Sequence, residues 1–151
     1  MSEKMLCISF DLLKSRAYQS LSSNAKVLLI EFLRRRKIKP IKTKSGRRNS
    51  IEILNNGRIV LPYKDIRKYC GIHSKATITK ALRELAFKGF IDRTERGTGG
   101  GNRKPSLYLI DDRWQDFDAN KGKARKPPKD NFPKRQERWR KDFYNFKECR
   151  K

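Results

Sequence analysis

The feature that most constrains the fold is the stretch of residues 61–90, LPYKDIRKYCGIHSKATITKALRELAFKGF. Its pattern predicts two short helices joined by a tight turn. The first helix is expected at about residues 63–70, and Gly71 ends it because glycine tolerates the left-handed conformation common at helix C-termini. After the turn at residues 71–73, Ser74 is a suitable N-cap, since its hydroxyl can accept a bond from an early backbone N–H of the next helix.

The second helix, residues 74–88, has one apolar face and one polar face. Ile78, Leu82 and Leu85 recur at helical spacing and are expected to pack into the core. The side chains that could contact DNA bases lie mostly off that face and are Lys75, Ala76, Thr77, Thr79, Lys80 and Arg83. Two helices so arranged, with a strand-like segment after Gly89, predict a helix-turn-helix whose second helix enters the major groove of DNA.

The charge of the chain indicates a polyanionic partner. The 151 residues carry 39 lysines and arginines against 16 aspartates and glutamates, a formal net charge of +23. Such an excess repels itself in a compact protein, and nucleic acid is the simplest partner that offsets it. The alternative is a disordered basic tail that has no specific partner.

The densest charge lies in residues 34–48, which hold nine basic residues and no acidic one. Pro40 and Gly46 interrupt any helix there, so an exposed loop or loosely ordered arm is expected, inserted into the domain at residues 34–50. Phosphate contact by this arm, rather than solvation alone, would add affinity but little sequence preference. The residues expected to contact phosphate, here and elsewhere, are Arg34, Arg35, Arg36, Lys42, Lys44, Arg47, Arg48, Ser74, Arg96, Arg103 and Lys104.

Helices are also expected before the arm. A short packing helix is expected within residues 10–21, where apolar residues lie near helical spacing at Phe10, Leu13, Ala17 and Leu21. Residues 22–33 predict the first helix of a three-helix core, capped by Ser22 or Ser23. Its buried stripe is expected to comprise Ala25, Leu28, Leu29 and Phe32, broadened by Val27, Ile30 and Leu33.

Two β-hairpins are expected beside the helices. IEIL and RIVL flank an Asn-Asn-Gly turn, and Asn-Gly is the strongest short hairpin signal, so residues 51–61 predict the first hairpin. Residues 90–94 and 106–110 predict the second, a wing with a basic, glycine-rich tip that suits the DNA backbone or minor groove. These glycines match no nucleotide-binding pattern. Trp114 and Phe117 are expected to pack one further turn onto the domain.

No catalytic or metal site is expected. One histidine, His73, and three widely spaced cysteines have no metal-ligand spacing, so free thiols are expected at Cys7, Cys70 and Cys149. The acidic residues are scattered, and the strongest run, Asp111 and Asp112, is expected to cap a turn. The chain shows neither a signal peptide nor an apolar run of the ~20 residues that a membrane span needs. No enzyme activity, cofactor, small-molecule ligand or membrane contact is therefore expected, and the expected location is cytoplasmic, at the nucleoid.

The chain beyond residue 118 is expected to be a basic and largely flexible extension. Residues 119–133 are polar, basic and broken by three prolines, which is typical of a linker. Residues 134–147 could form a helix in which cations alternate with aromatic residues. Such a helix suits stacking on nucleic acid, or docking on the domain or on a second subunit, so a homodimer stays open.

The segments NNGRIVLPYKDI, GIHSKATITKALRELAFKGFID and GTGGGN…SLYLIDDRW, in this order, resemble a family of winged helix-turn-helix DNA-binding proteins of bacteria and mobile elements. The resemblance covers about residues 10–118. It implies DNA binding and agrees with an α+β winged helix-turn-helix domain at residues 1–118, a three-helix core with a β-hairpin wing. Ile78 and Lys80 stand where relatives tend to have Phe and Arg, so no base preference is carried over.

The expected partner is double-stranded DNA, and the expected role is a transcription regulator or a replication or maintenance factor of a mobile element. One alternative is an RNA-binding protein of a ribonucleoprotein, which the arm and the aromatic tail would suit, although A-form RNA hides its major groove. A second is an architectural, non-specific DNA binder. A third is a protein-interaction module, which the charge disfavours because interface cores are depleted in charged groups.

Overall fold

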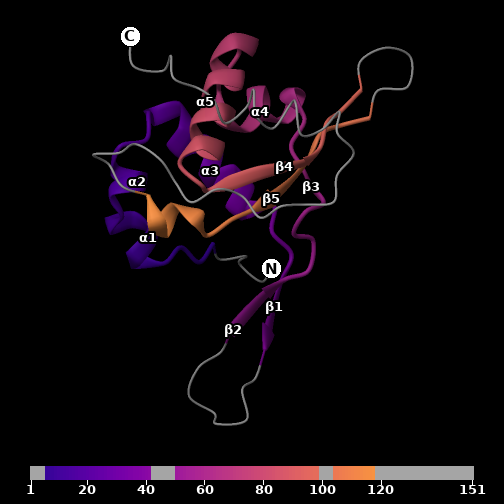
Figure 1. Cartoon of the computed structure of the whole chain (residues 1–151). Helices are drawn as coiled ribbons and strands as arrows, with labels where there is room; N and C mark the ends of the chain where they lie inside the picture. The colour runs from indigo at the N-terminus through magenta and orange to yellow at the C-terminus, as the bar shows by residue number, and fades with distance from the viewer. Residues whose placement is uncertain (1–5, 42–49, 99–103, 118–151) are drawn as a thin grey trace, which may run out of the picture.

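The computed structural model describes residues 6–41, 50–98 and 104–117. They form an α+β domain with two small antiparallel sheets, which is compatible with the expected winged helix (Figure 1). The elements, in chain order, are α1 (Phe10–Lys14), α2 (Arg16–Gln19), α3 (Ser23–Arg34), β1 (Ile38–Ile41), β2 (Ser50–Ile53), β3 (Ile59–Val60), α4 (Tyr63–Cys70), α5 (Lys75–Phe87), β4 (Ile91–Glu95), β5 (Leu107–Ile110) and the 3₁₀ turn η1 (Arg113–Asp116). The expected linker and the helix at 134–147 lie outside the described residues.

The packing helix expected within residues 10–21 is two helices, because Ser15 divides it. The Ser15 hydroxyl donates to the carbonyl of Leu12 (2.7 Å) and accepts from the N–H of Tyr18 (3.1 Å), so it ends α1 and caps α2. Serine competes in this way with the helical backbone for hydrogen bonds. Of the four apolar residues expected to pack, Ala17 and Leu21 are buried, whereas Phe10 and Leu13 lie on the surface.

Helix α3 is confirmed at the expected position, with Ser22 as its N-cap. Four expected core residues, together with Leu33, are buried: Ala25, Leu28, Leu29 and Phe32. Val27 and Ile30 were expected to broaden this stripe, but they are 42% and 41% exposed. They lie on the side of α3 turned away from the core, since a helix packed on one side buries only part of its circumference.

The two helices and tight turn expected at residues 61–90 are confirmed. Gly71 ends α4 in the left-handed conformation (φ 68°), and the hydroxyl of Ser74 caps α5 by accepting from the N–H of Thr77. Helix α4 buries Ile66 and the turn buries Ile72. Helix α5 then buries one face, made of Ile78, Ala81, Leu82, Leu85 and Ala86. The pair is held on α3 by this apolar packing.

Gly89 ends α5 and brings the chain against η1. Its φ is 82°, and a Cβ added there would lie 2.7 Å from the backbone of Arg113 and Trp114, so no side chain fits. The N–H of Trp114 donates to the carbonyl of Gly89 (3.1 Å), and the Trp114 ring stacks on Phe90 at 6.0 Å. The expectation that Trp114 packs one turn onto the domain is confirmed.

The expected wing is confirmed as the antiparallel pair β4–β5, and β3 adds to β5 to give the order β3-β5-β4. The hairpin expected at residues 51–61 is wrong. Strand β2 pairs instead with β1, inside the segment expected to be an irregular arm, and β3 pairs with β5. The Asn-Asn-Gly turn therefore carries the chain from one sheet to the other.

Two asparagine side chains explain this route. Asn55 accepts from the N–H of Lys37 (2.8 Å) and donates to the carbonyl of Arg35 (3.0 Å), which ties the turn to the segment between α3 and β1. Asn56 accepts from the N–H of Ile110 (2.7 Å) and donates to its carbonyl (3.1 Å), which ties the turn to β5. Both amides bind segments that are distant in the chain, so the turn does not close a local hairpin.

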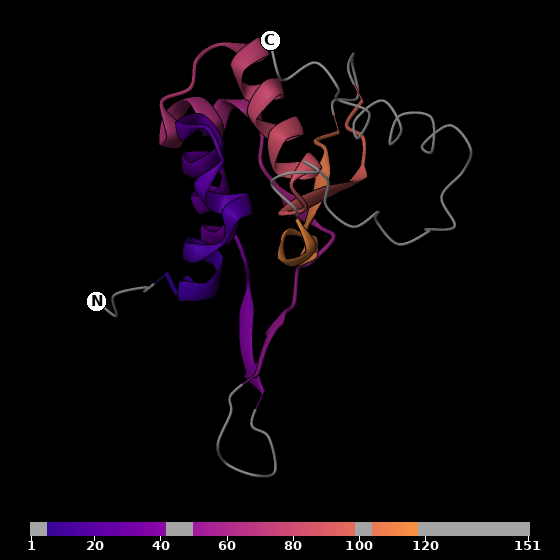
Figure 2. The ribbon, with the colours of Figure 1, turned by 60° about the vertical axis from the view of Figure 1, so that its left-hand side comes forward.

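The β1–β2 ribbon and the α4–α5 pair lie at opposite ends of the domain. Figures 1 and 2 both show the ribbon leaving at one end, while α4, the N-terminal half of α5 and the far ends of β4 and β5 lie at the other. The arm residues between β1 and β2, 42–49, are outside the described residues. Among the described helices, none combines the length and apolar character of a membrane span.

Candidate nucleic-acid interface

The outer face of α5 is the first part of the candidate interface. At 3.6 residues per turn, Ala76, Lys80 and Arg83 fall opposite the buried face, and Ala76 and Lys80 are exposed while Arg83 is partly exposed. Lys75 and Thr79 lie on one flank of this strip, and Thr77 lies on the other. All six residues expected to contact bases thus remain accessible on one side of α5, with Thr77 at its edge.

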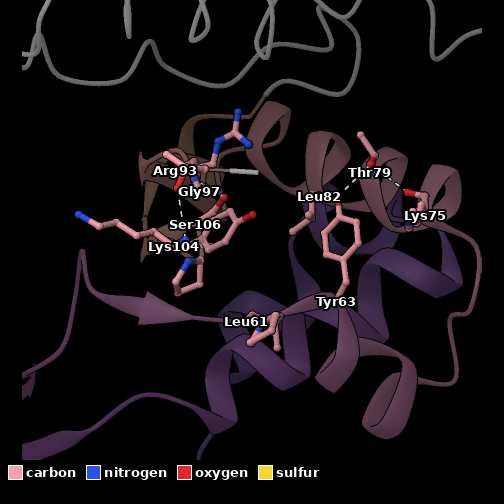
Figure 3. A pocket seen from close by; sticks show the side chains of 13 residues that line it. Leu61, Tyr63, Lys75, Thr79, Leu82, Arg93, Gly97, Lys104 and Ser106 are labelled. Carbon is pink, nitrogen blue, oxygen red and sulfur yellow. Dashed lines mark hydrogen bonds between the residues drawn. The ribbon is translucent and has the colours of Figure 1, made fainter. Parts of the chain in front are cut away.

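A groove separates α5 from the β4–β5 wing. It has a volume of about 840 Å³ and is lined from the start of α4, from α5 and from the wing. Figure 3 shows Tyr63, Lys75 and Thr79 on one side and Arg93, Ser106 and Lys104 on the other. Among the residues that the structure describes, none that lines the groove is acidic. Three cations therefore face one opening without a carboxylate among the lining residues.

The base of the wing is held in a fixed shape beyond the ends of its strands. The N–H of Gly97 donates to the hydroxyl of Ser106 (2.9 Å), and the N–H of Thr98 donates to the carbonyl of Lys104 (3.1 Å). The N–H of Lys104 returns a bond to the Thr98 hydroxyl (3.3 Å). These bonds place Lys104 at the groove.

Arg93 on β4 is a groove residue that the sequence analysis missed. Burial disfavours its charged form and lowers its pKa to about 10, an effect to which the neighbouring Arg96 contributes and which Tyr108 and Tyr63 offset only in part. A cation in such a place would gain from an arriving anion. Only the two-residue side-chain alternation of β4 could have indicated which side Arg93 faces, and the sequence does not show what lies on that side.

The acidic residue on α5 is neutralised locally. Glu84 accepts from the N–H (2.9 Å) and hydroxyl (2.6 Å) of Ser22 and pairs with Lys88 at 3.0 Å. Burial opposes the charged form of Glu84, but these partners outweigh it and lower its pKa. The carboxylate is thus directed at α3 and the end of α5, and the outer strip of α5 keeps its positive charge.

Arg35 does not fit the phosphate-contact role expected of it. Its guanidinium binds Glu31 (2.9 Å), the carbonyl of Val60 (3.0 Å) and Asp65 (2.7 Å), and its side chain is only 23% exposed. These bonds join α3 to β3 and α4, so Arg35 is a structural residue. The density of positive charge in the sequence concealed this role, because the acidic partners lie outside the basic segment.

Arg34 and Arg36 also have internal partners. Arg34 makes two hydrogen bonds to Glu31 (2.8 Å each) and lies over the ring of Tyr69. Arg36 donates to the carbonyls of Leu33 (3.1 Å) and Cys7 (2.9 Å). Arg34 is exposed enough to contact a phosphate as well, whereas the main role of Arg36 is to hold the N-terminal segment.

The remaining expected phosphate contacts divide by position. Ser74, Arg96 and Lys104 are exposed beside α5 or on the wing. Five others lie outside the described residues: Lys42, Lys44, Arg47, Arg48 and Arg103. Helix α4 adds three exposed cations that the sequence analysis did not single out, Lys64, Arg67 and Lys68. Their spacing of three and four residues places them on one side of α4 and could have indicated them.

In comparisons with known proteins, no family model matches the chain, and no curated protein or solved structure is significantly similar to it. Within residues 6–41, 50–98 and 104–117, no three histidine, cysteine, aspartate or glutamate side chains come together in a way that could hold a metal ion. Asp111 accepts from the backbone N–H groups of Asp112 and Arg113 and pairs with the Arg113 side chain. The expected turn-capping role is therefore confirmed for Asp111, whereas Asp112, at the N-cap of η1, makes no side-chain capping bond.

Proposed function

We propose that the protein binds double-stranded DNA through a winged helix-turn-helix formed by α3, α4, α5 and the β4–β5 wing. In this proposal α5 enters the major groove, which is wide enough to admit a helix, and the wing lies on the neighbouring backbone or minor groove. The role proposed for such a protein is that of a transcription regulator or a replication or maintenance factor of a mobile element; the resemblance noted in the sequence implies DNA binding and does not choose between these roles.

The observation that carries the proposal is the division of α5 into two faces. Ile78, Leu82 and Leu85 are buried, and the opposite strip presents a small residue, Ala76, between cations. A small side chain allows close approach to a thymine methyl, and Lys80 and Arg83 can donate to guanine. Local neutralisation of Glu84 removes the one carboxylate on α5 that would repel phosphate.

The opposite placement of the β1–β2 ribbon limits what else touches the same DNA. Lys39 on β1 and Lys37 directly before it are exposed, but the ribbon leaves the domain at the far end from the N-terminal half of α5 (Figures 1 and 2). We therefore assign the contact with the bound duplex to α4, α5 and the wing, and we leave Lys37 and Lys39 out of it.

The proposal is tested by selecting bound duplexes from a random pool and then measuring affinity for the selected duplex and for a random one. Replacing Lys80 with alanine is expected to weaken binding to the selected duplex by about tenfold, or about 1.4 kcal/mol, and to affect the random duplex much less. Arg83→Ala is expected to behave in the same way.

Lys14→Ala is the matched control, because Lys14 is an exposed cation on α1, far from α5. It should leave both affinities unchanged. Failure to enrich any duplex, or equal losses on selected and random duplexes for Lys80→Ala, would contradict sequence-specific binding by α5. Stronger binding of an RNA hairpin than of duplex DNA in a direct competition would contradict the choice of DNA.

A further inference from the structure

The groove lies between α5 and the wing, the two elements that contact DNA in the proposed function. One sugar–phosphate strand separates each major groove from the neighbouring minor groove. If α5 lies in the major groove and the wing beside the adjacent minor groove, that strand must pass between them. The occupant of the groove therefore follows from the docking geometry, and this inference rests on the proposed function.

We propose that the groove is a binding site for one phosphodiester strand of duplex DNA, with Arg93 on β4 and the hydroxyl of Tyr63 on α4 as its phosphate donors. Neither residue belongs to the outer strip of α5, and neither was indicated by the sequence. Lys75 and Lys104 stand on opposite sides of the same opening (Figure 3). A strand between them would have a cation on each side.

Arg93 is suited to this role by its partial burial. A fully solvated lysine or arginine gives up favourable hydration when it binds a phosphate, which reduces its net gain. Arg93 has lost part of its hydration in the free protein, where Tyr108 stabilises its charged form only in part and the neighbouring cation Arg96 opposes it. A phosphate oxygen would restore to the guanidinium the stabilisation that burial removed, and the planar guanidinium matches phosphate geometry.

The hydrogen bonds of the Tyr63 and Thr79 hydroxyls indicate how Tyr63 can donate to a phosphate. The Thr79 hydroxyl donates its one proton to the carbonyl of Lys75 (2.9 Å), so in the 3.1 Å contact between the hydroxyls of Tyr63 and Thr79 the tyrosine is the donor. Tyr63 is 37% exposed at the mouth of the groove. When a phosphate binds, the Tyr63 phenol can donate its proton to a phosphate oxygen instead of to Thr79. The Thr79 hydroxyl then still keeps its hydrogen bond to the carbonyl of Lys75.

The test compares Arg93→Met, Tyr63→Phe and the control Lys14→Met on a random-sequence duplex, which makes it independent of any target site. Arg93→Met is expected to weaken binding about tenfold and to reduce the slope of log affinity against log salt by about one. Tyr63→Phe removes one neutral donor, so it should weaken binding by a few-fold and leave the slope unchanged. Lys14→Met should change neither quantity.

Thermal unfolding of the free proteins separates a binding role from a structural one. Arg93→Met is expected to melt close to the temperature of the wild type, because it removes a partly desolvated charge together with the interaction of that charge with Tyr108. A lower melting temperature with unchanged affinity would overturn the proposal and make Arg93 a structural residue. Unchanged affinity and slope in both variants would overturn the groove site while leaving duplex binding by the wild type, and with it the proposed function, intact.

A last comparison identifies the source of the phosphate. Inorganic phosphate, added to the wild type at an ionic strength matched with chloride, is expected to raise the melting temperature far less than the duplex does. Larger stabilisation by inorganic phosphate, lost in Arg93→Met, would overturn the DNA strand as occupant and indicate a free anion instead.

Discussion

Replacing Arg35 with methionine should destabilise the fold and leave the affinity of the folded protein for DNA unchanged. Arg35 joins three elements, since its side chain binds Glu31 of α3, Asp65 of α4 and the carbonyl of Val60 on β3. Methionine retains most of the aliphatic stem but donates no hydrogen bonds. The perturbation therefore removes the charge and its bonds with little loss of apolar packing.

The magnitude follows from what is left behind. Breaking a buried ion pair by removing one partner costs about 3–5 kcal/mol. Here Glu31, whose side chain is 7% exposed, keeps Arg34 as a partner, and Asp65 is 31% exposed and can be hydrated. We therefore expect a loss of about 2–3 kcal/mol in the free energy of unfolding, somewhat below the range for a fully orphaned charge. For a domain of this size the melting temperature would fall on the order of 10 °C.

The assay is urea unfolding followed by circular dichroism, together with duplex affinity at a temperature where the variant is folded. Arg34→Met is the matched control, because it removes the other arginine that binds Glu31. The Arg34 side chain is 53% exposed and Glu31 keeps its bond to Arg35, so a much smaller loss of stability is expected. If Arg35→Met kept wild-type stability and instead lost affinity with a shallower salt dependence, Arg35 would be a phosphate contact and the structural role would be refuted.

Two further predictions concern the described core. Gly89→Ala should lower the free energy of unfolding in urea by about 3 kcal/mol or more, because the added Cβ would clash with the backbone of Arg113 and Trp114. Gly71 has a similar positive φ but open space around it, so Gly71→Ala should lower that free energy by only about 1 kcal/mol. Equal losses would contradict the close approach of α5 to η1. Glu84→Gln should cost about 1–3 kcal/mol at pH 7. The folded-state pKa of Glu84 lies below its usual 4.5. The contribution of Glu84 to the free energy of unfolding is therefore complete above pH 4.5 and is lost as the pH falls through the folded-state pKa. The wild type should lose stability more steeply on acidification than the variant, and parallel plots of unfolding free energy against pH would contradict this.

The sequence was a good guide wherever the structure follows from local interactions. The helix pair at residues 61–90 depends on the left-handed conformation at Gly71, the cap at Ser74 and the helical spacing of apolar residues, all of which act within a few positions. The wing was equally local, since its strands directly follow α5. These are the elements whose bounds were predicted to within a residue or two.

The sequence was a poor guide where distant segments compete for partners. The Asn-Asn-Gly turn carries a strong local hairpin signal, but the side chains of Asn55 and Asn56 bind Lys37 and Ile110, far away in the chain. Strand β2 found its partner in β1, within a segment whose charge predicted irregular structure. Arg93 escaped notice for the same reason, because its burial depends on how the wing packs beside α4 and α5.

Four acidic side chains of the domain are turned away from the candidate DNA surface by their partners. Glu31 and Asp65 bind Arg34 and Arg35, Glu84 binds Lys88 and Ser22, and Asp111 binds Arg113. Four carboxylates of the domain are thus committed to cations that hold α3, α4, α5 and η1 together. These four acids therefore do not offset the cations of α5, although Glu95 is exposed on the wing. The net charge alone could not distinguish the cations that bind these acids from the cations on α5 and the wing. Removing an internal partner such as Arg35 would release a carboxylate, so it would both weaken the fold and make the protein less basic.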